Sequence, residues 1–165
     1  MSNLQIRTAA KHDVETVISL INALSLYEKR KELDAGVRTR LLRDGFDEPR
    51  RFTTLLAELD GTAVGYALFF ETYSSFLAKP ILYLEDLLVL PETRSHGVGV
   101  ALFKACAAEG LARGCCRMEW TVLDWNQLAI DFYRKIGAEQ VNDRLLYRMS
   151  SEEMKPFVAA TALKP

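Results

Sequence analysis

The run from Tyr83 to Leu102 constrains the fold of this chain more than any other segment. It reads YLEDLLVLPETRSHGVGVAL: an apolar stretch with two carboxylates, then a proline-containing turn, a glycine-rich loop and a helix-forming segment. A strand that leads into a glycine-lined helix N-terminus is a common site for phosphate binding. The unpaired N–H groups of the first helical turn point outward there, and the helix dipole favours negative charge. The run therefore predicts a strand–helix unit with a phosphate-binding loop.

Composition and charge are typical of one globular domain spanning residues 1–165. Of the 165 residues, 49% are hydrophobic and 26% charged, and 21 basic and 22 acidic side chains give a net charge of −1. Without a basic excess we expect no nucleic-acid partner. No apolar run approaches the roughly 20 residues that span a bilayer. Because the N-terminus MSNLQIRTAAKHD lacks the apolar core of a signal peptide, we expect a cytoplasmic protein.

Cysteine and histidine are too sparse to suggest a disulfide framework or a metal centre. The three cysteines, Cys106, Cys115 and Cys116, are odd in number and two are adjacent, so we interpret them as free thiols. With only His12 and His96 as histidines, we expect no metal site.

Hydrophobic periodicity and turn residues predict an α/β fold, with an antiparallel hairpin region followed by strand–helix units. The hairpin turns at Asp60-Gly61, a pair suited to the two positive φ angles of a type I′ turn. Apolar spacing predicts helices over residues 10–28, Val37–Arg43, Val98–Ala112 and Asn126–Ile136. The expected strands are Leu4–Arg7, Phe52–Leu59, Ala63–Glu71, Ile81–Leu90, Arg117–Leu123 and Arg144–Met149.

The glycine-rich loop matches neither of two common phosphate motifs. No Gly-Lys-Ser/Thr follows it, which excludes a nucleoside-triphosphate P-loop. A dinucleotide fingerprint would need Gly or Ala where the chain has Leu102, and would lie earlier in the fold. For the loop alone, a tight strand-to-helix turn without a ligand is an equal alternative.

Two motifs together carry a family resemblance. Arg94-x-x-Gly97-x-Gly99, followed by Asn126 and Phe132-Tyr133-x-x-x-Gly137, resembles the GCN5-related N-acetyltransferases (GNAT). Further segments are similar to the diamine (spermidine/spermine) branch: Ile6-Arg7, Tyr27-Glu28, Leu41–Phe46, Tyr83–Asp86 and Trp125-Asn126. The resemblance implies the GNAT fold, a central mixed twisted sheet flanked by helices, with a splayed parallel strand pair that holds acetyl-CoA. It also implies a homodimer.

The resemblance assigns the cofactor contacts mainly to backbone. The pyrophosphate would be bound by N–H groups of Ser95, His96, Gly97, Val98, Gly99 and Val100. Arg94 would add charge near the phosphates, or would be a solvated surface arginine. The pantetheine arm would pair with Leu87, Leu88 and Val89, where this strand splays from Arg117–Leu123, and one N–H would polarise the thioester carbonyl. Asn126 would cap its helix and hydrogen-bond the cofactor arm.

The resemblance also suggests the catalytic residues. Tyr133 would be the general acid, because a phenol stays protonated at neutral pH; the alternative is a core tyrosine. Glu85 would hold the substrate amine and pass its proton through water. Strand alternation predicts opposite faces for Glu85 and Asp86. Asp86 would attract a cationic substrate or be structural. Tyr27 and Glu28 would contact the acceptor or form an exposed helix end.

The expected reaction is direct attack of a small-molecule primary amine on acetyl-CoA in a ternary complex, since no cysteine occupies a motif position. Compared with the diamine branch, Thr72–Pro80 contains no carboxylate and has Phe76 near the tryptophan position, and Glu139–Asp143 is shortened and lacks the tryptophan. A polyamine, a diamine and a thialysine-like amino acid therefore all stay open as acceptor. Two alternatives remain. One is a protein amine as acceptor. The other is a non-catalytic acyl-CoA-binding module, which would be marked by loss of Tyr133 or Glu85, and both are present.

Overall fold

A computed structural model describes residues 3–94 and 96–160 of the chain. They form two compact units, Met1–Thr121 and Val122–Pro165, and each is described by itself. Within the described residues, no helix is long and apolar enough to cross a bilayer.

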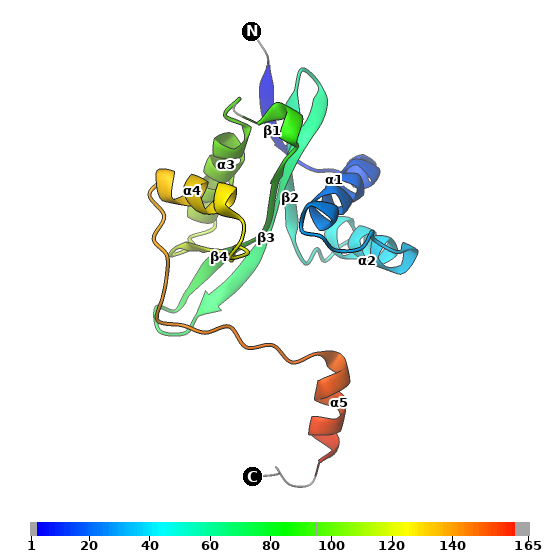
Figure 1. Ribbon diagram of the computed structural model, residues 1–165, viewed down its shortest axis with the longest axis vertical. Coiled ribbons are helices and arrows are strands. Elements are labelled where there is room, and N and C mark those ends of the chain that lie inside the picture. The colour runs from blue at the N-terminus through cyan, green and yellow to red at the C-terminus, as the bar shows by residue number, and fades with distance from the viewer. Residues whose placement is uncertain (1–2, 95, 161–165) are drawn as a thin grey trace. The chain divides into compact units, whose positions relative to one another are not determined.

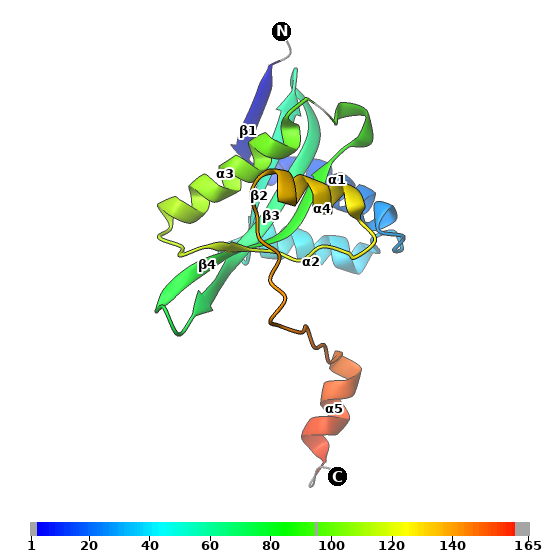
Figure 2. The ribbon, with the colours of Figure 1, turned by 60° about the vertical axis from the view of Figure 1, so that its left-hand side comes forward.

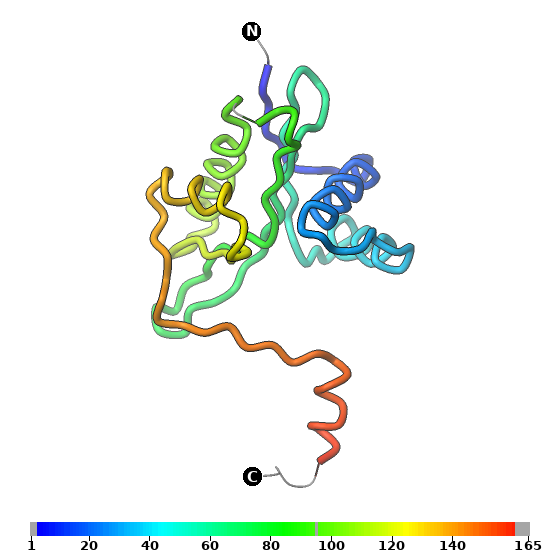
Figure 3. The backbone as a smooth tube through the Cα atoms, in the orientation of Figure 1, coloured from blue at the N-terminus to red at the C-terminus, as the bar shows by residue number. Residues whose placement is uncertain are grey.

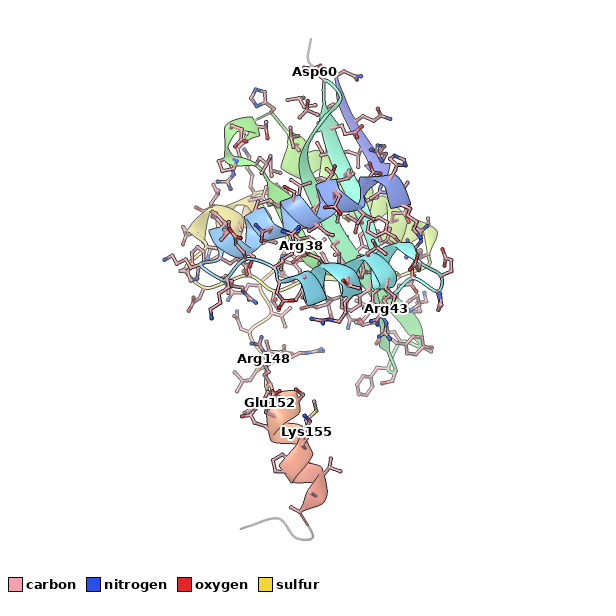
Figure 4. All side chains as sticks on the ribbon, turned by 90° about the vertical axis from the view of Figure 1, so that its right-hand side faces the viewer. Arg38, Arg43, Asp60, Arg148, Glu152 and Lys155 are labelled. Carbon is pink, nitrogen blue, oxygen red and sulfur yellow. The ribbon has the colours of Figure 1, made fainter. Side chains whose placement is uncertain are left out.

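The first unit is built on a five-stranded mixed sheet in the order β1-β2-β3-β4-β5. The first four strands pair antiparallel, and β4 and β5 pair in parallel, which confirms the predicted α/β sheet. The strands are β1 (Leu4–Thr8), β2 (Thr53–Leu59), β3 (Thr62–Ser74), β4 (Lys79–Val89) and β5 (Met118–Glu119). The hairpin between β2 and β3 has the predicted turn: φ is 52° at Asp60 and 81° at Gly61. Figure 4 shows Asp60 at its tip.

Helices cover both faces of this sheet (Figures 1 and 2). One face carries α1 (Val14–Tyr27) and α2 (Ala35–Phe46), and the other carries α3 (Val98–Ala112). Short 3₁₀ turns, η1 (Lys11–Asp13) and η2 (Pro91–Thr93), precede α1 and the loop before α3. The predicted helix over residues 10–28 is thus a 3₁₀ turn followed by an α-helix, and α2 exceeds the predicted Val37–Arg43 at both ends.

Each face of the sheet has its own apolar core, because successive strand side chains point to opposite faces. Leu56 packs with Val17 and Ile18 of α1, whereas its neighbour Ala57 packs with Leu102 and Cys106 of α3. Cys106 is a buried free thiol, as predicted.

The second unit contains α4 (Gln127–Lys135), an extended segment and α5 (Ser151–Ala159) (Figure 3). The Asn126 side chain caps α4 by accepting a hydrogen bond from the Ala129 N–H at 3.3 Å, as predicted. The predicted strand Arg144–Met149 is wrong: these residues form no strand, and Leu145, Leu146 and Tyr147 are exposed. A strand needs a partner strand, and the described residues of this unit contain none.

Candidate active site

A β-bulge in β4 places two carboxylates at one site. Leu68 of β3 pairs with Asp86 and the next residue, Phe69, pairs with Leu84, so Glu85 is an extra residue without a partner on β3. A bulge interrupts the two-residue alternation of side chains. Glu85 and Asp86 consequently line the same pocket, and the predicted placement on opposite faces is wrong.

The pocket has a volume of about 450 Å³, within the range of roughly 300–1,000 Å³ typical of small-ligand sites. It lies where the helices α1 and α2 meet the sheet. Its lining is apolar apart from the two carboxylates and one arginine, and consists of Ile21, Leu41, Arg51, Phe52, Leu68, Phe70, Glu85 and Asp86. A small organic cation with an apolar stem suits such a lining.

Asp86 is held by a buried tyrosine that the sequence analysis did not single out. The Tyr66 hydroxyl donates a hydrogen bond to Asp86 Oδ2 at 3.0 Å, and the Tyr66 side chain is fully buried. Burial raises the pKa of Asp86 to about 6, although the Tyr66 hydrogen bond acts in the opposite direction. Burial and the nearby Asp86 charge raise the pKa of Tyr66 well above its usual value, so its phenol remains a donor. Asp86 therefore titrates close to neutral pH.

One edge of β4 is open beyond its first half. β5 pairs only with Leu82 and Tyr83, so the predicted strand Arg117–Leu123 is shortened to two residues. Beyond Tyr83, no strand among the described residues pairs with β4 on this side. The Leu90 N–H donates to Val64 of β3, and by alternation the N–H groups of Leu87 and Val89 point to the open edge. This is the splayed strand edge that was predicted to meet the pantetheine arm.

The N-terminus of α3 offers free backbone donors near this edge. Gly97 is the N-cap residue at φ 77°, and among the described residues no side chain caps the helix. The N–H groups of Val98, Gly99 and Val100 therefore have no intrahelical acceptor. The His96 Nδ1 atom lies 2.9 Å from the Arg94 carbonyl oxygen, so its side chain faces its own loop. The predicted contact at Ser95 lies outside the described residues.

Arg94 is half-buried and makes two contacts with the protein. Its Nε donates to the Val89 carbonyl oxygen at 3.1 Å, and its guanidinium lies 5.4 Å from the centre of the Tyr27 ring. Arg94 thus joins the end of α1 to the open edge of β4. Beside Tyr27, the Glu28 carboxylate forms an ion pair with Arg30 at 3.0 Å, and neither Tyr27 nor Glu28 is among the residues that line the pocket.

Tyr133 lies on α4 in the second unit, where its ring contacts Phe132 edge-on with 5.4 Å between the centroids. Burial raises the pKa of Tyr133 to about 12. The phenol therefore stays protonated throughout the physiological range, as a general acid requires.

The chain is similar to known acetyltransferases in sequence. The family model described as "Acetyltransferase (GNAT) family" matches residues 13–138, which lie in both units. Thialysine N-epsilon-acetyltransferase of Bos taurus is 34% identical over 151 residues, covering 87% of this chain and 88% of the relative. L-ornithine N5-acetyltransferase NATA1 of Arabidopsis thaliana is 36% identical over 110 residues, covering 66% of this chain and 48% of the relative.

Solved structures show the same fold. An integron cassette protein from V. cholerae superposes with a TM-score of 0.81 at 22% identity, covering 95% of this chain and 98% of that one. The aminoglycoside N-acetyltransferase AAC(6')-Iy in complex with CoA gives a TM-score of 0.75 at 22% identity, covering 90% and 96%. With the open edge of β4, the uncapped N-terminus of α3 and the family match over most of its length, the chain belongs to the acetyltransferase (GNAT) family and is an N-acetyltransferase that uses acetyl-CoA.

Proposed function

We propose that this enzyme acetylates the primary amine of a small molecule, a diamine, a polyamine or a thialysine-like amino acid. The observation that carries the proposal is the pocket of about 450 Å³ with Glu85 and Asp86 in its wall. Two carboxylates among apolar side chains favour a cationic ligand with an aliphatic stem. The names of the relatives, which include thialysine and ornithine acetyltransferases, support the same acceptor class.

The cofactor supplies an acetyl thioester, and the chain offers matching donors for it. The uncapped N–H groups at the start of α3 would hold the pyrophosphate, and the Leu87 and Val89 N–H groups would pair with the pantetheine arm. These backbone donors do not depend on a side chain at Arg94. Arg94 holds the edge of β4 against Tyr27 through Nε and its guanidinium plane, and its charge would add to the attraction for the phosphates.

The proton chemistry falls to side chains with suitable pKa values. Glu85, at the bulge, would bind the incoming ammonium. Asp86, with a pKa of about 6, would accept its proton at neutral pH, a role that the sequence analysis gave to Glu85. Tyr133, with a pKa of about 12, would supply the proton to the leaving thiolate. We propose direct attack in a ternary complex, with both units acting as one acetyltransferase domain.

We also infer a homodimer, which the diamine-branch resemblance implies. Exposed apolar side chains between α4 and α5 support it: Val141 is 66% exposed and Tyr147 86%. A second copy of the chain would remove this surface from water. Light scattering during size-exclusion chromatography would report the mass, and a monomer at micromolar concentration would contradict the inference.

An amine panel tests the acceptor class. Polyamines, diamines, lysine analogues, other amino acids and a lysine-containing peptide are assayed with acetyl-CoA for thiol release. We expect turnover with small amines and its loss in the Asp86→Asn variant. Turnover of the peptide alone would favour a protein acceptor and overturn the proposal.

A further inference from the structure

Among the described residues, Arg51 is the one cationic side chain in the wall of the amine pocket. It lies in the segment between α2 and β2, just before the first strand residue, Thr53. A pocket that served only to hold a polycation would gain nothing from a guanidinium, because like charges repel. Arg51 in the same wall as Glu85 and Asp86 therefore suits a ligand that carries a negative group in addition to its amine.

The strand register separates Arg51 from the carboxylates. Leu68 of β3 pairs with Thr54 on one side and with Asp86 on the other, so these three residues form a row across the sheet. With about 4.8 Å between neighbouring strands, the backbones of β2 and β4 lie roughly 10 Å apart. Arg51 precedes this row on the β2 side, and Leu68 and Phe70 form an apolar floor between the charges.

Arg51 shares its acidic partner, Asp44, with a second arginine. Asp44 is already held by Arg43, whose Nε and Nη2 donate to its two oxygens at 2.8 and 3.1 Å. Figure 4 shows Arg43 on α2. Arg51 approaches Asp44 only at 3.4 Å, and its side chain is 76% exposed. Two arginines thus share one carboxylate, and the Arg51 fork retains donors for a ligand.

We infer that Arg51 is a specificity-determining residue that binds the carboxylate of an α-amino acid while the terminal amine of that molecule meets Glu85 and Asp86. The inference rests on the proposed function, and it selects an amino acid with an aliphatic amine side chain over a diamine or polyamine. A guanidinium can pair with a carboxylate through two parallel hydrogen bonds. A diamine would place an ammonium or a methylene group next to Arg51 and would gain no binding energy from the guanidinium.

The test compares amines that differ only in the carboxylate: ornithine with putrescine, and lysine with cadaverine. Steady-state kinetics and calorimetric binding in the presence of CoA are measured for the unaltered enzyme, Arg51→Gln and Arg51→Lys. We expect Arg51→Gln to lower kcat/KM for ornithine about 10- to 100-fold, through KM rather than kcat. Putrescine should be unaffected, and Arg51→Lys should restore part of the loss. Arg50→Gln is the matched control, since Arg50 pairs with Glu48 and does not line the pocket.

Equal losses for ornithine and putrescine, no loss for either, or a preference of the unaltered enzyme for putrescine would each overturn the role of Arg51. If neither amine released CoA, the proposed function would fail instead. Calorimetry would then still decide on Arg51: ornithine binding weakened only in Arg51→Gln would uphold it, and binding that is absent or unchanged would refute it.

Discussion

At the scale of single residues, the pair Tyr66–Asp86 links stability to chemistry. A carboxylate taken out of water is costly, and the protein holds Asp86 beside a fully buried phenol that remains protonated. The same burial brings its pKa to about 6, so at neutral pH the carboxylate is mostly ionised and can accept a proton. A solvated aspartate would be fully ionised but a much weaker proton acceptor.

The Tyr66→Phe variant tests this assignment. The Tyr66 hydrogen bond lowers the pKa of Asp86, so its removal should raise that pKa further. The proposed mechanism requires the ionised carboxylate, so the acidic limb of the kcat/KM–pH profile should move upward by about 0.5–1 pH unit. Tyr73→Phe is the control, because Tyr73 lies on the same strand and is 65% exposed. An unmoved limb would show that another group titrates.

Tyr133 is tested by its own phenylalanine variant. Loss of the phenol should lower kcat by about 10²- to 10⁴-fold, while CoA affinity measured by calorimetry stays within about twofold. With a pKa of about 12 the phenol does not titrate below pH 9, so the native profile should have no basic limb from Tyr133. Full turnover by Tyr133→Phe would remove it from the mechanism.

At the scale of elements, the conformation of one glycine shapes the proposed cofactor site. Gly97 enters α3 at φ 77°, a region that costs other residues roughly 1–2 kcal/mol, yet a Cβ there would meet no atom within 4 Å. The constraint is therefore in the backbone and not in packing. It sets the direction from which the chain enters the helix and leaves the first N–H groups uncovered.

Gly97→Ala should weaken CoA binding about tenfold or more, because the loop must leave its left-handed conformation or remain strained. Gly114→Ala is a matched control at the other end of α3: its φ is 72°, and a Cβ there also meets nothing within 4 Å. Both variants should lose similar free energy of unfolding, measured with urea. Calorimetry should find weaker CoA binding only in Gly97→Ala; equal CoA affinities would contradict a role for the loop.

At the scale of the whole molecule, two carboxylates give stability opposite dependences on pH. Arg7 pairs with Asp13 at 2.7 Å and with Glu58 at 2.6 Å, which ties the start of α1 to β1 and β2. The Arg7 hydrogen bonds lower the pKa of Asp13 to about 2. The ionised Asp13 carboxylate thus stabilises the folded state above pH 4, and this stabilisation is lost as the pH falls towards 2. Asp86, with its raised pKa, destabilises the folded state as the pH rises through about 6.

Asp13→Asn and Asp86→Asn should therefore behave oppositely in urea unfolding. At pH 8 we expect Asp13→Asn to lose about 1–3 kcal/mol and Asp86→Asn to gain about 1–3 kcal/mol, since one unit of pKa difference is worth about 1.4 kcal/mol. The loss of unfolding free energy in Asp13→Asn should shrink between pH 4 and 2. The gain of unfolding free energy in Asp86→Asn should vanish near pH 4. A pH-independent effect of either variant would refute the linkage.

The sequence by itself determined the features that depend on a few neighbouring residues. Asp60-Gly61 predicts the hairpin, and Asn126 predicts the cap of its helix. The glycine-rich run before Val98 predicts where a helix starts. Each of these features follows from local backbone preference. The pairing of two distant motifs also predicted the family. These signals can be recognised in the sequence alone, because they do not depend on which residues pack against them.

Only the tertiary structure decided the chemistry of the amine pocket. The bulge at Glu85 depends on the register between β3 and β4, and it reverses the face that simple alternation predicts for one carboxylate. In the sequence Tyr66 resembles an ordinary core residue, and only the structure shows that its hydroxyl donates to Asp86. Arg51 resembles an ordinary surface charge, and only the structure places it in the pocket wall. The prediction of a strand at Arg144–Met149 was wrong for the same reason. Whether two distant segments pair depends on the folded sheet and not on the local sequence.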